Sequence, residues 1–142
     1  MTLKNKITIF TAICALSLVA AVTHAHEGGH DAPGLVQAPK GGEIKAIEEA
    51  YIEVLSQKNE VKIYFYQKDL KPFADLKKFT VSAEAQLPRT KIMTPLTLKE
   101  SGGSLTTKFD AKGAHRYTLV LKVKDSSHGH DDRLNFTIEP RR

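Results

Sequence analysis

Cysteine is almost absent from this chain, and tryptophan is missing altogether. The single cysteine, Cys14, lies in an apolar N-terminal run, and Ile13 before it is not the small residue of a lipoprotein signal. We expect Cys14 to be removed with that run, which leaves an exported chain without disulfides or thiolate ligands. Met93 is then the only thioether of the exported chain. A Cu(I) site built on several sulfur ligands is therefore excluded.

Long hydrophobic runs are also lacking, apart from the one at the N-terminus. There, a run of sixteen uncharged residues follows two lysines and ends shortly before Thr23 and Ala25, which suit the −3 and −1 positions of a cleavage site. The sequence predicts a signal peptide over residues 1–25, cleaved after Ala25, or after Ala21, where Val19 also fits. No other run approaches the ~20 residues of a transmembrane helix. We therefore expect a periplasmic or secreted protein that is not inserted in the membrane after cleavage.

Charge of one sign is not in large excess. The signal peptide contains two of the 21 basic residues and none of the 16 acidic ones, so the exported chain has 19 against 16, a net charge of +3. Lysine and glutamate are interspersed, which indicates a solvated surface and not a nucleic-acid footprint. Catalytic signatures such as G-x-S-x-G, H-E-x-x-H or a phosphate-cradling loop are lacking. We therefore expect a protein that is not an enzyme.

Short apolar runs of period two follow Gly42, which is the pattern of half-buried strands. The predicted strands are residues 43–47, 51–55, 61–66, 81–87, 92–98, 105–109, 117–124 and 134–138. Pro95 restricts its strand to a sheet edge or a bulge. We predict an all-β fold, an antiparallel immunoglobulin-like β-sandwich of seven to eight strands over residues 41–142. Residues 26–40, rich in Gly, Pro and His, are predicted to be a flexible tail.

Four of the six histidines lie in two short clusters. The first is His26-Glu27-Gly28-Gly29-His30-Asp31, and the second is His128-Gly129-His130-Asp131-Asp132 in the turn between the last two predicted strands. After cleavage at Ala25, His26 would bind a metal through its α-amine and its imidazole, with His30 and Asp31 completing the coordination. Cleavage after Ala21 would instead place His24 third from the amine, which is also a Cu(II) or Ni(II) chelate.

The second cluster has its own chelating pattern. One glycine separates His128 from His130 and lets the two imidazoles converge, while Asp131 adds an oxygen ligand or orients an imidazole. Nitrogen and carboxylate donors favour Cu(II), with zinc or nickel as alternatives. The competing interpretation is a solvated polar turn and a tail whose histidines are incidental.

The two ends of the chain resemble the small periplasmic copper-resistance proteins of the CopC-like family. Those proteins are β-sandwiches whose mature chain begins with a metal-binding His, which His26 matches. Their second Asp/His ligand set precedes the final strand, as His128, His130 and Asp131 do here. Residues 41–64 also resemble exported domains associated with heavy-metal efflux. Two departures are the tail of about fourteen residues after His26 and a His-Gly-His sequence where the family favours Asp-Gly-His.

The leading hypothesis is a periplasmic metal-binding protein that captures or buffers Cu(II), or delivers it to an envelope efflux or uptake partner. The alternative is an immunoglobulin-like accessory domain of an envelope complex. A third interpretation is a copper oxidase or oxygenase that uses the terminal His. A tail of fourteen residues spans at most about 45 Å, so its length permits both clusters to share one ion.

Overall fold

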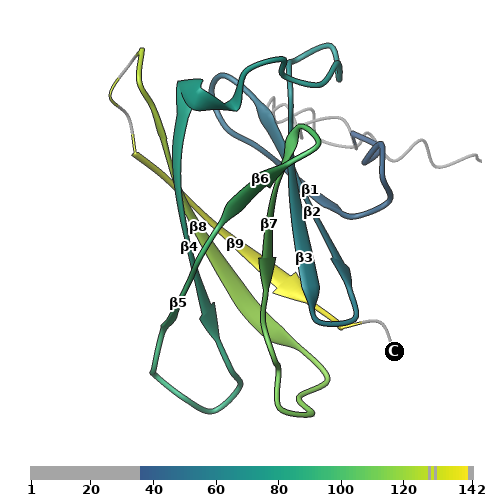
Figure 1. Cartoon of the computed structure of the whole chain (residues 1–142), viewed down its shortest axis with the longest axis vertical. Helices are drawn as coiled ribbons and strands as arrows, with labels where there is room; N and C mark the ends of the chain where they lie inside the picture. Colours follow the sequence, from purple (N-terminus) through teal and green to yellow (C-terminus); the bar gives the residue numbers. More distant parts are fainter. Residues whose placement is uncertain (1–35, 128, 130, 141–142) are drawn as a thin grey trace, which may run out of the picture. The chain divides into compact units, whose positions relative to one another are not determined.

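Nine β-strands form two antiparallel sheets in the computed structural model, which describes residues 36–127, 129 and 131–140 (Figure 1). The five-stranded sheet has the order β1 (Glu43–Ala46), β2 (Tyr51–Gln57), β3 (Glu60–Tyr66), β7 (Ser104–Lys108) and β6 (Lys99–Ser101). The four-stranded sheet has the order β5 (Thr94–Leu96), β4 (Phe79–Gln86), β8 (Tyr117–Asp125) and β9 (Asp131–Ile138). One 3-10 turn, η1 (Leu76–Lys78), precedes β4. No helix among the described residues has the length and hydrophobicity to cross a bilayer.

The predicted antiparallel sandwich of immunoglobulin-like type is confirmed. The orders β2-β3-β7-β6 and β5-β4-β8-β9 correspond to the A-B-E-D and C′-C-F-G sheets of that architecture, with β1 added at one edge. Strands β3 and β8 are internal to their sheets. The structure has one strand more than the upper limit of the expectation, because β6 was not predicted.

The core lies between the sheets and consists of the alternating residues of each strand. The side chains of Val61, Ile63 and Phe65 on β3 are buried, as are those of every second residue from Tyr117 to Val123 on β8. Phe65 stacks on Phe79, with ring centroids 4.9 Å apart. Burial raises the pKa of the Tyr117 phenol to about 12. The fold is therefore held by burial and packing, as a domain without disulfides requires.

Pro95 lies on an edge strand, as predicted. In β5 it is opposite Glu84, and β5 has no neighbour on its other side. A proline is tolerated there because it has no backbone N–H to donate to a further strand. The chain then crosses to the other sheet, where β6 pairs with β7 (Figure 1).

The first described residues fold over the outer face of the five-stranded sheet. A turn is closed by the Gly41 N–H, which donates to the Ala38 carbonyl at 3.0 Å. Glu53, on the outward face of β2, is nevertheless fully buried. Its carboxylate accepts hydrogen bonds from the backbone N–H groups of Lys40 (3.0 Å) and Gly42 (2.7 Å) and from the Tyr66 hydroxyl (2.9 Å). Residues 40–42 are thus attached to the sheet by one buried side chain.

The edges β1 and β9 are joined by side chains instead of a ladder. Glu43 accepts a hydrogen bond from the Thr137 N–H at 3.1 Å, and Lys45 donates to the Asn135 carbonyl. Glu43 and Lys45 also form an ion pair at 3.1 Å. These contacts satisfy main-chain groups of β9 that face away from β8, and they place the start of β1 beside the C-terminal half of β9.

Candidate metal-binding hairpin

Asp131 is the only predicted metal ligand that lies within the described residues. His26, His30, Asp31, His128 and His130 lie outside them, as does the predicted signal peptide. The exposed Asp131 is the first residue of β9 and is opposite Lys124 on β8. The described part of the chain contains no group of three or more His, Cys, Asp or Glu side chains that could hold a metal. The description of the site is therefore a description of the hairpin that carries the second cluster.

The last two strands are hairpin partners, as predicted. They pair without interruption from Tyr117 with Ile138 to Lys124 with Asp131. The loop is shorter than the turn predicted between strands 117–124 and 134–138, because Asp125 still belongs to β8 and β9 already begins at Asp131. In sequence, the second histidine cluster therefore lies at the end of a long ladder whose last pair is Lys124 and Asp131.

Asp125 is a buried residue and not part of a solvated turn. It is 6 % exposed, and its Oδ1 accepts hydrogen bonds from the Ser127 backbone N–H (2.7 Å) and hydroxyl. This is the Asx arrangement, in which an aspartate caps the backbone two residues later. The Ser127 hydroxyl, then its N–H, and then the Lys78 ammonium hold the pKa of Asp125 below its usual value. The first half of the loop is thereby fixed to the end of β8.

A second attachment connects the loop to the segment before β4. Both the backbone N–H and the hydroxyl of Ser126 donate to the Lys78 carbonyl, at 3.1 and 2.6 Å. The Lys78 ammonium lies 3.4 Å from Asp125 Oδ2. Figure 1 shows the end of the β8–β9 hairpin beside η1 and the start of β4. The loop is thus attached to a neighbouring strand as well as to its own.

Gly129 supplies the turn of the loop. Its N–H donates to the Asp125 carbonyl at 3.1 Å, and its φ is +69°. That backbone conformation is available to glycine without the steric cost that a side chain would bring. The glycine between the two predicted histidine ligands therefore has a conformational role in reversing the chain.

Charged side chains of both signs surround Asp131. A hollow of about 370 Å³ on the outer face of the four-stranded sheet is lined by Thr80, Ser82, Lys122, Lys124, Asp131, Asp132 and Arg133. Lys122 forms an ion pair with Glu84 at 3.2 Å. The neighbouring lysines and the arginine partly cancel the negative potential of the Asp131 carboxylate. This carboxylate alone is therefore a poor cation site and requires additional ligands.

Sequence reasoning missed the residues that hold the loop, namely Lys78, Ser126 and Ser127. The Asp125-Ser126-Ser127 spacing is a readable signal for an Asx turn. Lys78 gives no such signal, because it approaches the loop from a distant part of the sequence. His115 is exposed and precedes β8 at the end opposite to the loop, so it is separate from the candidate site.

Comparisons with protein-family models, with curated proteins and with solved structures find no match to this chain. The function is therefore proposed from the chain's own residues, and the resemblance to CopC-like proteins stays a prediction.

Proposed function

We propose that this protein is an extracytoplasmic metal-binding protein that captures or buffers Cu(II), or passes it to an envelope transport partner. The observation that carries the proposal is the attachment of the β8–β9 loop through Asp125 and Ser126. The loop has a fixed base at Lys124 and Asp131, and its sequence contains two histidines around one glycine. A held loop lowers the entropy that must be lost when its side chains converge on an ion.

Donor chemistry supports copper over other ions. The predicted ligands are imidazole nitrogens, an α-amine and carboxylates, and thiolates are absent from the predicted mature chain. Nitrogen-rich sets bind Cu(II) more tightly than the other divalent first-row ions, with Ni(II) and Zn(II) next. The resemblance of both chain ends to CopC-like copper-resistance proteins supports the same proposal.

We further propose that the two histidine clusters bind one ion together. The second cluster offers two imidazoles and the Asp131 carboxylate. A four-coordinate Cu(II) site prefers more nitrogen ligands than these two imidazoles. His26, with its amine, and His30 would supply the rest. Fixing the tail costs about 1–2 kcal/mol for each ordered residue, which a chelate of several bonds offsets when only a few residues are involved.

The test is a calorimetric titration of protein that begins at His26 with Cu(II), Zn(II) and Ni(II). Intact mass of material from the envelope fraction first checks the N-terminus. A full-length, membrane-anchored product would contradict the proposed location. We expect one Cu(II) per chain, weakened by His26→Ala and by His128→Ala with His130→Ala, whereas the exposed His115→Ala control is unchanged.

The two single-cluster variants and their combination separate a shared site from two sites. With a shared site, the combined variant loses less than the sum of the two losses. Two ions per chain, each removed by its own variant, would contradict sharing and leave metal binding intact. No saturable binding of any of the three metals would contradict the proposed function and favour an accessory domain with incidental histidines.

A further inference from the structure

A second hollow lies at the other end of the four-stranded sheet. It has a volume of about 440 Å³, and its polar lining consists of Gln86, Arg89, Thr90, Arg116, Thr118 and Thr137. None of the residues that line it is acidic. The hollow therefore combines two cations and several hydrogen-bonding side chains with no carboxylate.

Three adjacent strands form its floor. Gln86 on β4 is opposite Thr118 on β8, and Thr118 is opposite Thr137 on β9. These three residues alternate with core residues, so their side chains are on the outer face of the sheet. An amide and two hydroxyls are thus arranged in one row across a rigid ladder.

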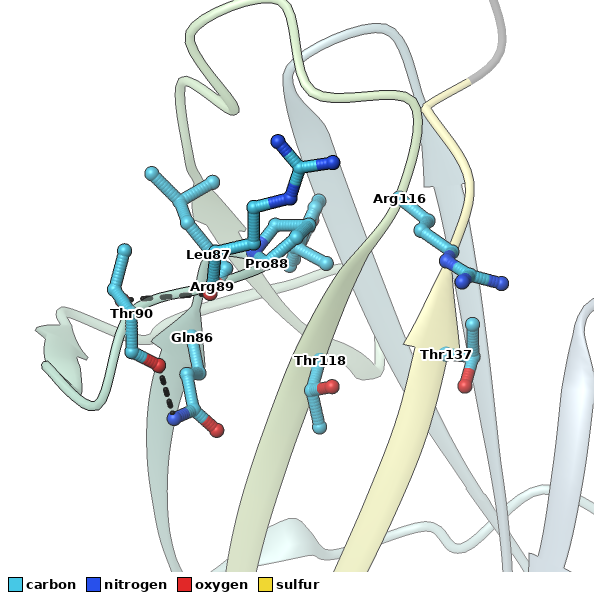
Figure 2. A pocket seen from close by; sticks show the side chains of 9 residues that line it. Gln86, Leu87, Pro88, Arg89, Thr90, Arg116, Thr118 and Thr137 are labelled. Atoms are coloured by element: carbon cyan, nitrogen blue, oxygen red, sulfur yellow. Dashed lines mark hydrogen bonds between the residues drawn. The ribbon is translucent and has the colours of Figure 1, made fainter.

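The two arginines come from different loops at the rim. Arg116 precedes β8, Arg89 belongs to the loop between β4 and β5, and Figure 2 shows them on either side of the hollow. Neither forms an ion pair with a carboxylate of the described residues. Glu84, one row along the same face, is already paired with Lys122. Glu139 and Glu43 line a neighbouring hollow that shares Thr137 with this one, and Glu43 there accepts a hydrogen bond from the Thr137 N–H.

Arg89 is held in a conformation that is unfavourable for an arginine. Its φ is +64°, in a turn from Leu87 to Thr90 with Pro88 at the second position. A turn with proline second and a positive φ third is of type II, and glycine or asparagine is the usual third residue. Lys58, Leu70 and Lys112 also have a positive φ, and Arg89 is the one of the four that lines this hollow.

The loop that carries Arg89 is fixed before any ligand arrives. The Gln86 side-chain amide donates to the Thr90 carbonyl at 2.7 Å (Figure 2). The N–H and the hydroxyl of Thr90 both approach the Leu87 carbonyl at 3.3 Å. Little conformational freedom of the loop backbone would therefore be lost on binding.

We propose that this hollow binds a tetrahedral oxyanion, the phosphate or sulfate group of a small molecule or of a lipid headgroup. A guanidinium presents planar, paired N–H donors that match such oxygens, and two of them from opposite sides would hold one anion. Thr118 and Thr137 add neutral donors beneath. This site is separate from the metal site proposed above.

The test uses the full mature chain, treated with a chelator so that bound metal has no influence. Calorimetry measures binding of sodium phosphate and of sodium sulfate, with ionic strength held constant by sodium chloride. We expect saturable binding of one anion per chain, weakened at least about tenfold by Arg89→Gly and by Arg116→Gln. The matched control Arg133→Gln, on the same face but outside the hollow, should change the affinity less than about twofold.

Arg89→Gly also separates binding from folding. Glycine accepts a positive φ, so this variant should unfold at the same temperature as the wild type or higher. Cosedimentation with phosphatidylcholine vesicles, with and without phosphatidylglycerol, distinguishes the two sources of the anion. Binding that requires phosphatidylglycerol and is lost in Arg89→Gly identifies a headgroup, and saturation by free phosphate identifies a soluble ligand. Absence of both, or equal weakening by Arg133→Gln, would overturn the proposal.

Discussion

Replacing Glu53 tests whether one buried carboxylate holds the chain before β1 to the sheet. Glu53→Ala removes the acceptor of the Lys40 N–H, the Gly42 N–H and the Tyr66 hydroxyl. Lys40 is exposed, so water can replace its partner, whereas Tyr66 is 2 % exposed. A buried donor left without an acceptor costs about 1–3 kcal/mol. With roughly two such donors, we expect the free energy of unfolding to fall by about 2–4 kcal/mol.

Glu53→Gln should cost much less, about 1 kcal/mol. Its carbonyl oxygen can accept from the two backbone N–H groups, and its amide can donate to the Tyr66 hydroxyl, which is able to rotate. What is lost is mainly the charge of the acceptor. Glu60→Ala is the matched control, since Glu60 lies on the adjacent strand, is 40 % exposed and pairs with Lys62 at 3.5 Å. An exposed pair of this kind contributes at most about 1 kcal/mol.

Urea denaturation gives the unfolding free energies, and amide hydrogen exchange gives the local effect. In a domain of this size, the loss in Glu53→Ala corresponds to a decrease of roughly 10–20 °C in the melting temperature. Amide hydrogen exchange at Gly42 should accelerate in Glu53→Ala by more than the global loss of stability explains. In Glu53→Gln it should accelerate only slightly. If Glu53→Ala were no less stable than Glu60→Ala, residues 40–42 would not be held by this carboxylate.

Three further predictions follow from particular residues. Gly42→Ala should lower the unfolding free energy by about 1–3 kcal/mol in urea denaturation, because a β-carbon there would lie 2.3 Å from the Val54 carbonyl oxygen, and an unchanged free energy would contradict this clash. Folding raises the pKa of Tyr117 to about 12. The protonated phenol therefore contributes roughly 2–3 kcal/mol to the free energy of unfolding below pH 10, and this contribution is lost as the pH rises from about 10 to 12. Tyr117→Phe should flatten that part of the curve of unfolding free energy against pH. Imidazole binds metal only when neutral, with an ordinary pKa of about 6.5, so Cu(II) affinity measured by competition should fall between about pH 7 and pH 5, and constant affinity would exclude histidine as the main ligand.

The sequence pattern predicted the strands wherever apolar residues alternate. Val61, Ile63 and Phe65 identify a core strand by themselves, and Pro95 identifies an edge. Strand β6 could not be found in this way, because Lys99-Glu100-Ser101 contains no apolar residue and all three residues are exposed. Its pairing with β7 follows from the tight turn at Gly102-Gly103, where both glycines have positive φ.

Polar residues show the limit of that pattern. Glu53 alternates with Ile52 and Val54 and therefore reads as solvent-exposed, yet it is fully buried. Its burial depends on residues 40–42 folding back over the sheet, and a period of two contains no information about what covers the outer face. Asp125 was placed in a polar turn for the same reason, although Lys78, from another part of the chain, lies against it. The candidate ligands other than Asp131 stay predictions.

The two proposed sites lie at opposite ends of the same pair of strands. The metal loop is closed by Lys124 and Asp131, whereas the floor of the oxyanion hollow includes Thr118 and Thr137. Six residues of strand separate the two ends, about 20 Å at roughly 3.3 Å per residue. Sites that far apart, with no shared partner, lose binding free energy independently. A metal-site variant should therefore leave phosphate affinity unchanged, and Arg89→Gly should leave Cu(II) affinity unchanged, so the failure of either proposal leaves the other standing.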